Sequence, residues 1–176
     1  MKLLKTRFKD LLIYEKKTSK DKRGYFKELF RQNYFKEKFP FDYMSFSNKN
    51  VLRGLHLQLQ NPQSKLITVL MGKIFDVSLD CRKNSKTFGR FFTTILSEKN
   101  NKSILIPKGF AHGFCSLTKN VILHYKCSEY RHERSEIGIL WDDKDLKIRW
   151  PIKNPIISKK DRKNLTFSEF NKINIL

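Results

Sequence analysis

Cysteine is scarce in this chain, and its spacing argues against two common kinds of small protein. The 176 residues include only three cysteines, Cys81, Cys115 and Cys127. An odd number without Cys-x-x-Cys spacing is typical of neither a disulfide framework nor a zinc knuckle. We therefore expect three reduced, packed thiols.

Long apolar runs are also missing. No segment approaches the roughly 20 apolar residues of a membrane-spanning helix, and charges interrupt the N-terminal stretch MKLLKTRFKDLL before a signal peptide could form. The sequence has no repeats, low-complexity tracts or linkers. We expect one cytoplasmic domain over residues 1–176, with no membrane partner.

Acidic residues are few relative to basic ones. The chain has 17 Asp and Glu against 37 Lys and Arg, a formal net charge of +20. A nucleic-acid-binding protein would gather these charges into a patch, but the lysines are scattered along the whole sequence. We therefore expect no nucleic-acid partner and favour a small anionic ligand.

Short apolar segments separated by polar, Gly-, Pro- or Asn-containing turns dominate the sequence. They predict strands at residues 65–70, 74–80, 91–97, 103–106, 113–117, 121–126 and 137–141. Helix is expected only at residues 33–38 and 159–173. Regularly spaced short strands favour an antiparallel sandwich or barrel, so the predicted fold class is all-β with a few short peripheral helices.

The first two of these segments predict a local pairing. Residues 74–80 (IFDVSLD) alternate apolar and polar side chains, the period-two pattern of a half-buried strand. They follow residues 65–70 after only Met71, Gly72 and Lys73, of which Met71 and Gly72 indicate the turn. This spacing predicts a β-hairpin.

Polar side chains on otherwise apolar segments are the candidate functional residues, because inward-facing side chains of separate strands can converge on one pocket. They are His56, Lys65, His112, Tyr125 and Asp161. Each has a plainer interpretation: a histidine among leucines is often a hydrogen-bonded core residue, Lys65 could end a strand in solvent, Tyr125 could be a core residue, and Asp161 could cap the last helix. Spacing alone leaves these alternatives open.

Signals for metal or cofactor chemistry are weak. A histidine-based metal site in a small barrel would need a His-x-His pair, and position 58 is Gln. The sequence has no Gly-x-Ser-x-Gly elbow and no Gly-rich nucleotide loop. We therefore expect neither a metal nor a cofactor.

Motifs in a fixed order give a more specific indication. They are DKRGYFKE at 21–28, VLRGLHLQ at 51–58, Lys65-Leu66 leading into Gly72 and Phe75-Asp76-Val77, IPKGFAHGF at 106–114, Tyr125-Lys126 before Tyr130, ILWDD at 139–143, and Trp150-Pro151 before Ser158–Asp161. Together they resemble the dTDP-4-dehydrorhamnose 3,5-epimerase family of nucleotide-sugar epimerases. The resemblance covers residues from about 20 to 165 and implies an antiparallel cupin or jelly-roll barrel.

The resemblance also implies a reaction. A ketone at C4 of a nucleotide-linked 6-deoxy sugar acidifies the hydrogens on C3 and C5, so removing a proton and returning one to the opposite face inverts the centre. His56 would be the base, Asp161 would orient it, Lys65 would stabilise the enolate, and Tyr125 would be the acid.

The resemblance to the family also implies which residues bind the substrate. Arg23 and Arg53 are expected on the diphosphate, His112 on the sugar, Tyr130 beside the base or sugar, and Phe26 and Glu28 in the pocket wall, reached across a subunit interface. Gly54 is expected to let its strand approach the ligand. The resemblance further implies a homodimer that exchanges an N-terminal strand through residues 20–30.

One departure keeps alternatives open. Before the VLRG motif, family members that use dTDP often carry a Gln-x-Asn-type stretch, where this chain has Tyr43–Ser47 (YMSFS), and the following loop looks shortened. The nucleotide could therefore be GDP, carrying a 4-keto-heptose, and the epimerase could act at C3 alone. A ketoisomerase that moves the carbonyl, or a non-enzymatic sugar-binding barrel, are the alternatives from other classes.

Overall fold

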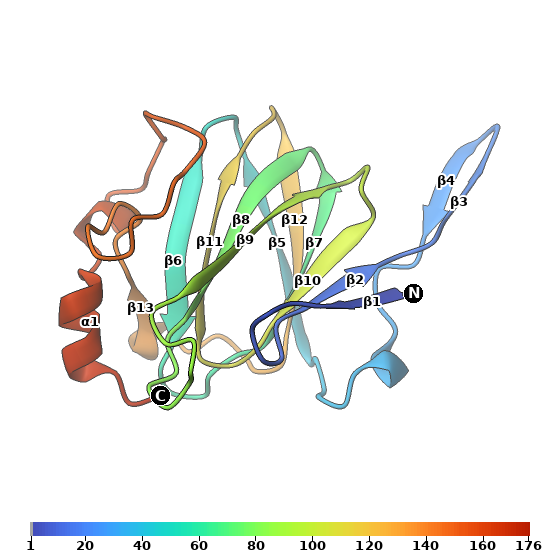
Figure 1. The fold of residues 1–176 in the computed structure, drawn as a ribbon. Coiled ribbons are helices and arrows are strands. Elements are labelled where there is room, and N and C mark those ends of the chain that lie inside the picture. Colours follow the sequence, from blue (N-terminus) through green and yellow to red (C-terminus); the bar gives the residue numbers. More distant parts are fainter. Residues whose placement is uncertain (1) are drawn as a thin grey trace.

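Two antiparallel sheets face each other in the computed structural model, which describes residues 2–176 (Figure 1). The six-stranded sheet has the order β1 (Lys2–Lys5), β2 (Leu12–Glu15), β10 (Lys102–Ile106), β7 (Lys65–Met71), β12 (Val121–Cys127) and β5 (Phe41–Ser47). The five-stranded sheet has the order β13 (Glu136–Gly138), β6 (Leu52–Gln58), β11 (Phe110–Ser116), β8 (Lys73–Asp80) and β9 (Phe91–Ser97). This confirms the expected all-β, cupin-like fold.

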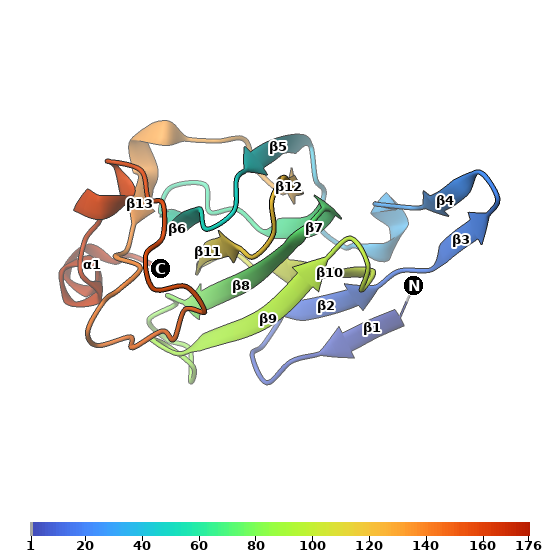
Figure 2. The ribbon, with the colours of Figure 1, turned by 90° about the horizontal axis from the view of Figure 1, so that it is seen from above.

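A small hairpin of β3 (Thr18–Asp21) and β4 (Gly24–Lys27) projects away from the two sheets (Figures 1 and 2). Within residues 2–176, helix is limited to three 3-10 turns, Gln32–Tyr34, Glu133–Ser135 and Asp161–Lys163, and to α1 (Phe167–Ile173). The predicted helix at 33–38 is thus a single turn, and the one at 159–173 begins as an α-helix only at Phe167. Thr166, and not Asp161, caps α1 through a capping box with Glu169.

The period-two pattern of the strands separates the molecule into layers. Inward-facing side chains such as Ile67, Val69 and Leu123 form the core between the sheets. The opposite face of the five-stranded sheet, including Leu55 and Leu57, packs against the C-terminal segment around α1. His56 lies between these two leucines in sequence, so it faces the space between the sheets.

The predicted hairpin of residues 65–70 and 74–80 is wrong. Both segments are strands, but β7 pairs with β10 and β12, whereas β8 pairs with β11 and β9. Gly72, with a φ of +83°, turns the chain from one sheet to the other. Two boundaries differ from the prediction by three residues, since β11 starts at Phe110 and β13 ends at Gly138, whereas the other differences are of one residue.

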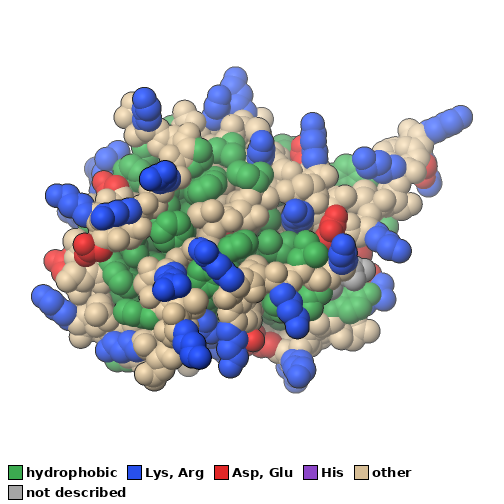
Figure 3. All heavy atoms as spheres, in the orientation of Figure 1, with side chains coloured by type: hydrophobic (Ala, Val, Ile, Leu, Met, Phe, Trp, Pro, Cys, Tyr) green, Lys and Arg blue, Asp and Glu red, His purple; other side chains and the backbone are tan. Residues whose placement is uncertain are grey.

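Basic side chains are not gathered on one element of the face that Figure 3 draws. Lys and Arg side chains are spread across this face with apolar and neutral side chains between them. Within residues 2–176, no helix combines the length and apolarity needed to cross a membrane.

Candidate active site

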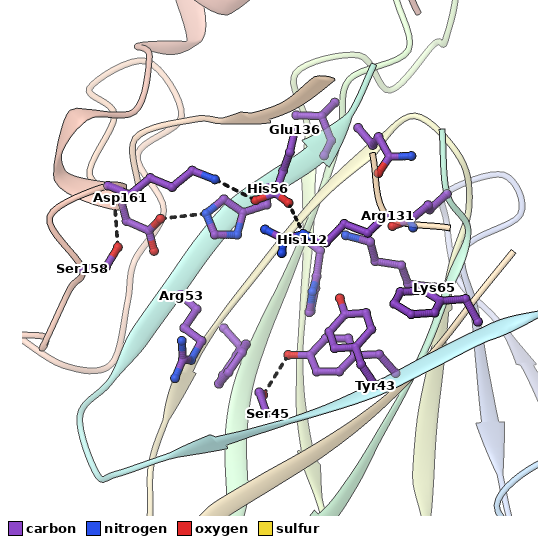
Figure 4. Close-up of a pocket in the computed structure, with 17 residues that line it drawn as sticks. Tyr43, Ser45, Arg53, His56, Lys65, His112, Arg131, Glu136, Ser158 and Asp161 are labelled. Atoms are coloured by element: carbon purple, nitrogen blue, oxygen red, sulfur yellow. Dashed lines mark hydrogen bonds and ion pairs between the residues drawn. The ribbon is translucent and has the colours of Figure 1, made fainter. Parts of the chain in front are cut away.

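A cavity of about 480 Å³ opens between the two sheets, close to the segment that precedes α1 (Figure 4). The side chains around it come from strands β5, β6, β7, β11, β12 and β13 and from residues 158–161. Six of the residues selected from the sequence line it: Arg53, His56, Lys65, His112, Tyr125 and Asp161.

His56 and Asp161 form a close pair although 105 positions separate them in the sequence. His56 Nε2 lies 2.7 Å from Asp161 Oδ1. The other carboxylate oxygen accepts the Gly54 N–H at 3.3 Å, and Ser158 Oγ accepts the Asp161 N–H at 3.0 Å. Burial alone would raise the pKa of the Asp161 carboxyl, but the hydrogen bond from His56 and that from Gly54 outweigh it and lower this pKa.

This pairing fixes the tautomer of His56. An ionised carboxylate can only accept, so Nε2 must carry the hydrogen that it donates to Asp161. The neutral ring then keeps its free lone pair on Nδ1. His56 is therefore arranged as a proton acceptor whose positive form Asp161 would stabilise.

His112 forms a second pair of the same kind. Its Nε2 lies 2.7 Å from Asp76 Oδ2, and both side chains are buried. Asp76 comes from β8, the neighbouring strand in the sheet. The sequence motif contained Asp76, but nothing in its spacing indicated that it would hold His112.

Lys65 lies at the start of β7 and lines the same cavity. Burial lowers the pKa of its ammonium group, while Cys127 and Glu136 act in the opposite direction. A poorly solvated ammonium of this kind interacts strongly with a negative charge placed beside it. Lys65 is therefore a suitable partner for an oxyanion.

Tyr125 reaches the cavity from β12 with only 5% of its surface exposed. Its hydroxyl lies 3.3 Å from Ser45 Oγ, and its ring is stacked on that of Tyr43. Burial raises the pKa of the Tyr125 phenol well above its usual range. The hydroxyl therefore stays protonated at neutral pH and can donate a proton.

Charged side chains from three segments meet at one side of the cavity. Glu136 accepts hydrogen bonds from Arg131 Nε and Lys160 Nζ, each at 2.9 Å. Gln58 secures the same rim: its amide nitrogen donates to the Asn61 carbonyl at 2.7 Å, and its oxygen accepts the His132 N–H at 2.8 Å. Sequence analysis did not select Arg131, Glu136 or Lys160, because isolated charged side chains are usually solvated, and it considered Gln58 only as the position that lacks the second histidine of a metal site.

Arg53 lies at the cavity with its guanidinium turned along β5. Its Nε donates to Ser47 Oγ at 3.1 Å, and its Nη2 donates to the Phe46 carbonyl at 3.0 Å. These bonds use two of the five N–H donors of the guanidinium. The remaining donors are available to an anion.

Four expected binding residues do not line the cavity of this chain. Arg23 pairs with Asp21 at the tip of the β3–β4 hairpin, Glu28 pairs with Arg31, and Phe26 is 76% exposed. Tyr130 packs against Phe41 beside the cavity, with ring centroids 5.8 Å apart, but remains largely exposed.

The role expected for Gly54 is corrected as well. An added Cβ there would lie 2.5 Å from Gly113 Cα and 2.8 Å from the His112 carbonyl oxygen. The close approach is therefore to the backbone of β11, and not to a ligand. Gly54 is needed for the contact between two strands that carry His56 and His112.

A family model, a curated relative and a solved structure all relate this chain to the same enzyme family. Residues 5–169 match the family model described as dTDP-4-dehydrorhamnose 3,5-epimerase. The enzyme of that name from Shigella flexneri is 44% identical, over 92% of this chain and 93% of its own. A crystal structure of dTDP-4-dehydrorhamnose 3,5-epimerase from Bacillus anthracis with TDP and PPi bound has a TM-score of 0.91 at 40% identity, covering 94% of this chain and 99% of that one.

A second solved structure carries a sugar nucleotide. The dTDP-6-deoxy-D-glucose-3,5-epimerase of Legionella pneumophila, in complex with dTDP-4-keto-L-rhamnose, has a TM-score of 0.91 at 40% identity, covering 95% of this chain and 93% of that one. The likeness thus extends over almost the whole chain and includes every segment that surrounds the cavity.

Proposed function

The chain belongs to the dTDP-4-dehydrorhamnose 3,5-epimerase family and is an isomerase, and we propose that it inverts C3 and C5 of a 4-keto-6-deoxy sugar carried on dTDP. One observation carries the proposal: a histidine held by a carboxylate, a lysine and a buried tyrosine line one cavity. Base, oxyanion partner and acid are the groups that this inversion needs.

Proton removal falls to His56. Its Nδ1 accepts the hydrogen from C3 or C5, and the electron pair of that C–H bond forms the enolate double bond as charge moves to the C4 oxygen. The resulting imidazolium is stabilised by Asp161, 2.7 Å from Nε2. Proton transfer by a positioned group of this type contributes about 10²- to 10⁴-fold to rate.

Lys65 stabilises the enolate oxygen. The negative charge at C4 develops only as the proton leaves, so a preorganised cation stabilises the transition state more than the ketone. The compact ammonium of lysine suits a single oxygen better than the wide fork of arginine.

Tyr125 completes the inversion by donating its proton to the carbon from the opposite face. The phenolate then regains a proton from solvent, and His56 releases its own, so the net change is one inverted centre. These are proton transfers throughout, and the proposal invokes no metal or redox cofactor.

The diphosphate is assigned to Arg53 of the same chain and, from a second copy, Arg23. The two solved relatives described above contain TDP or a dTDP-linked hexose. This supports dTDP over GDP as the nucleotide, and a hexose over a heptose as the sugar. Free, buried Cys81, Cys115 and Cys127 fit a reducing cytoplasm, which we propose as the location of this single-domain enzyme.

The exposed apolar side chains of the β3–β4 hairpin support the proposal of a homodimer. Tyr25 and Phe26 on this projecting hairpin are 61% and 76% exposed, and an apolar surface of this kind marks an interaction site. We propose that a second copy covers it, and that Arg23, Phe26 and Glu28 enter the cavity of that copy.

The reaction is tested by incubating the protein with the dTDP-linked 4-keto-6-deoxy sugar in heavy water and following deuterium by NMR. Deuterium at C3 and C5 supports the proposal, and deuterium at C3 alone identifies a C3 epimerase. A relocated ketone would indicate a ketoisomerase instead, and no deuterium with either dTDP or GDP sugars would exclude the proposed function.

His56→Asn provides the internal control. The proposal requires this variant to lose deuterium incorporation while it still binds dTDP, measured by calorimetry. Incorporation at the wild-type rate would remove His56 from the role of base.

A further inference from the structure

The inward face of β5 lies directly behind the proposed acid. Alternate residues of this strand, Phe41, Tyr43 and Ser45, line the cavity. Tyr43 and Ser45 belong to the stretch that departs from the family pattern and that left the nucleotide open. In the folded chain both side chains contact Tyr125, which suggests a different role for the departure.

Tyr43 and Tyr125 are opposite each other in the antiparallel ladder between β5 and β12. Their rings are stacked, with centroids 4.5 Å apart and planes inclined by only 9°. Directly opposed residues on one face of a sheet interact most strongly, and stacked aromatic rings add to this. One face of the Tyr125 ring is therefore fixed by Tyr43 (Figure 4).

Two further contacts restrict the same side chain. The Tyr125 hydroxyl lies 3.3 Å from Ser45 Oγ, two residues along β5. The His112 ring meets Tyr125 edge to face, with centroids 6.3 Å apart and an angle of 70°. Tyr43 is the contact that covers the largest flat surface of Tyr125, so its loss would leave the ring free to tilt.

We propose that Tyr43 is a positioning residue, which holds the Tyr125 hydroxyl at the face of the sugar opposite to His56. The inference rests on the proposed function, because it takes Tyr125 as the acid. A base and an acid on opposite faces give two separable events: His56 can return a deuteron to the face it took it from, whereas only Tyr125 inverts the centre. Displacing Tyr125 therefore slows inversion and leaves exchange largely intact.

The test compares Tyr43→Ala with Tyr43→Phe. Both events are measured in heavy water: deuterium in recovered substrate reports exchange, and appearance of the inverted sugar reports inversion. Loss of the stacked ring in Tyr43→Ala should raise the ratio of exchange to inversion about three- to tenfold. Tyr43→Phe keeps the ring and should retain the wild-type ratio, and Tyr43→Leu tests a side chain that fills space without a flat face.

A double variant separates positioning from a general effect on the fold. Tyr125→Phe removes the proton donor, so inversion falls to a residual rate that does not depend on the placement of the hydroxyl, and adding Tyr43→Ala should change this residual rate no further. The inference is overturned if Tyr43→Ala keeps the wild-type ratio of exchange to inversion, or if it lowers the residual inversion rate of Tyr125→Phe by the same factor by which it lowers the wild-type inversion rate. Failure of the wild-type protein to incorporate any deuterium would instead overturn the proposed function.

Discussion

Lys65 illustrates how one residue can be recognised from sequence while its chemistry depends on the fold. A lysine that begins an apolar strand is ordinarily a solvated end. Here it lines a cavity, and burial lowers the pKa of its ammonium group. Burying a positive charge is unfavourable, but the same charge stabilises a negative charge that develops beside it during the reaction.

Lys65→Met should therefore lose about 10²- to 10³-fold in kcat, the usual effect of removing one oxyanion donor. Substrate affinity should change much less, because the ketone carries little charge before the proton leaves. Single-turnover measurement of deuterium incorporation gives the chemical step, and calorimetry gives the affinity. A variant with normal kcat and weakened affinity would assign Lys65 to binding instead.

At the residue scale, motif residues could be selected from sequence, but their partners could not. His56 and Asp161 were both candidates, yet the 2.7 Å contact requires the segment before α1 to fold over the end of β6. Asp76 and Tyr43 were not selected, since only the pairing of neighbouring strands brings them to His112 and Tyr125.

At the scale of elements, strands could likewise be predicted from the sequence, but their pairing partners could not. The alternation in residues 74–80 correctly identified a strand, which depends on backbone geometry alone. The strand is not half-buried as expected, since Asp76, Ser78 and Asp80 are at most 1% exposed. The partner of that strand was wrong, because a short turn joins strands within a sheet or between two sheets equally well. In β11, the run from Phe110 to His112 was missed since the preceding Pro107 and Gly109 indicated a turn.

Pairing of β6 with β11 depends on Gly54. This residue has a φ of +123°, and a Cβ would meet Gly113 Cα at 2.5 Å. Gly54→Ala should destabilise the protein by about 1–3 kcal/mol through overpacking and backbone strain. Urea unfolding gives the change in free energy.

Gly24→Ala is a matched control for this prediction. Gly24 has a similar φ of +131°, but nothing lies within 4 Å of its added Cβ. The backbone strain is therefore shared, and the contact with β11 is not. Equal destabilisation by the two substitutions would show that strand packing at Gly54 contributes nothing.

Glu136 at the start of β13 links this strand to Arg131 and Lys160. Burial raises the pKa of its carboxyl, but the two hydrogen bonds outweigh this and lower the pKa to about 2 from an ordinary 4.5. A depressed folded-state pKa contributes stability above the unfolded-state pKa, and this contribution is lost as pH falls through the folded-state value.

The stability lost in Glu136→Gln should therefore be constant near neutral pH, decline below about pH 4.5 and disappear toward about pH 2. Urea unfolding at pH 7, 5 and 3 measures the difference from wild type. Glu133→Gln is the control, because Glu133 also bonds Arg131 at 2.9 Å but its side chain is 75% exposed. A difference that grows on acidification would contradict the prediction.

At the scale of the whole molecule, part of the lining expected for the cavity lies away from the cavity of the same chain. Arg23, Phe26 and Glu28 lie on or next to a hairpin that projects from the body, and other residues of the same chain engage the first and last of these. The resemblance to the family places them in the pocket with His56, with Phe26 and Glu28 reached across a subunit interface. The exchanged homodimer proposed above would bring the hairpin of one copy to the cavity of the other.

Complementation between inactive variants tests this assembly. His56→Asn destroys the base of its own cavity but supplies an intact hairpin, whereas Arg23→Ala has an intact cavity and a defective hairpin. If hairpins are exchanged, a mixed dimer contains one cavity in which both parts are intact. Random reassociation of equal amounts should then restore about a quarter of wild-type activity per chain.

The recovered activity depends on which chain contributes the hairpin to a cavity, so exchanged and unexchanged hairpins give different results. Dissociating and refolding the two variants together permits mixed dimers, whereas mixing them after separate refolding is the control and should stay at the level of the single variants. Recovery only after joint refolding establishes that Arg23 serves a neighbour's cavity. If Arg23 instead served its own chain, His56→Asn cavities would lack the base and Arg23→Ala cavities would lack the arginine in every dimer, and no activity would return.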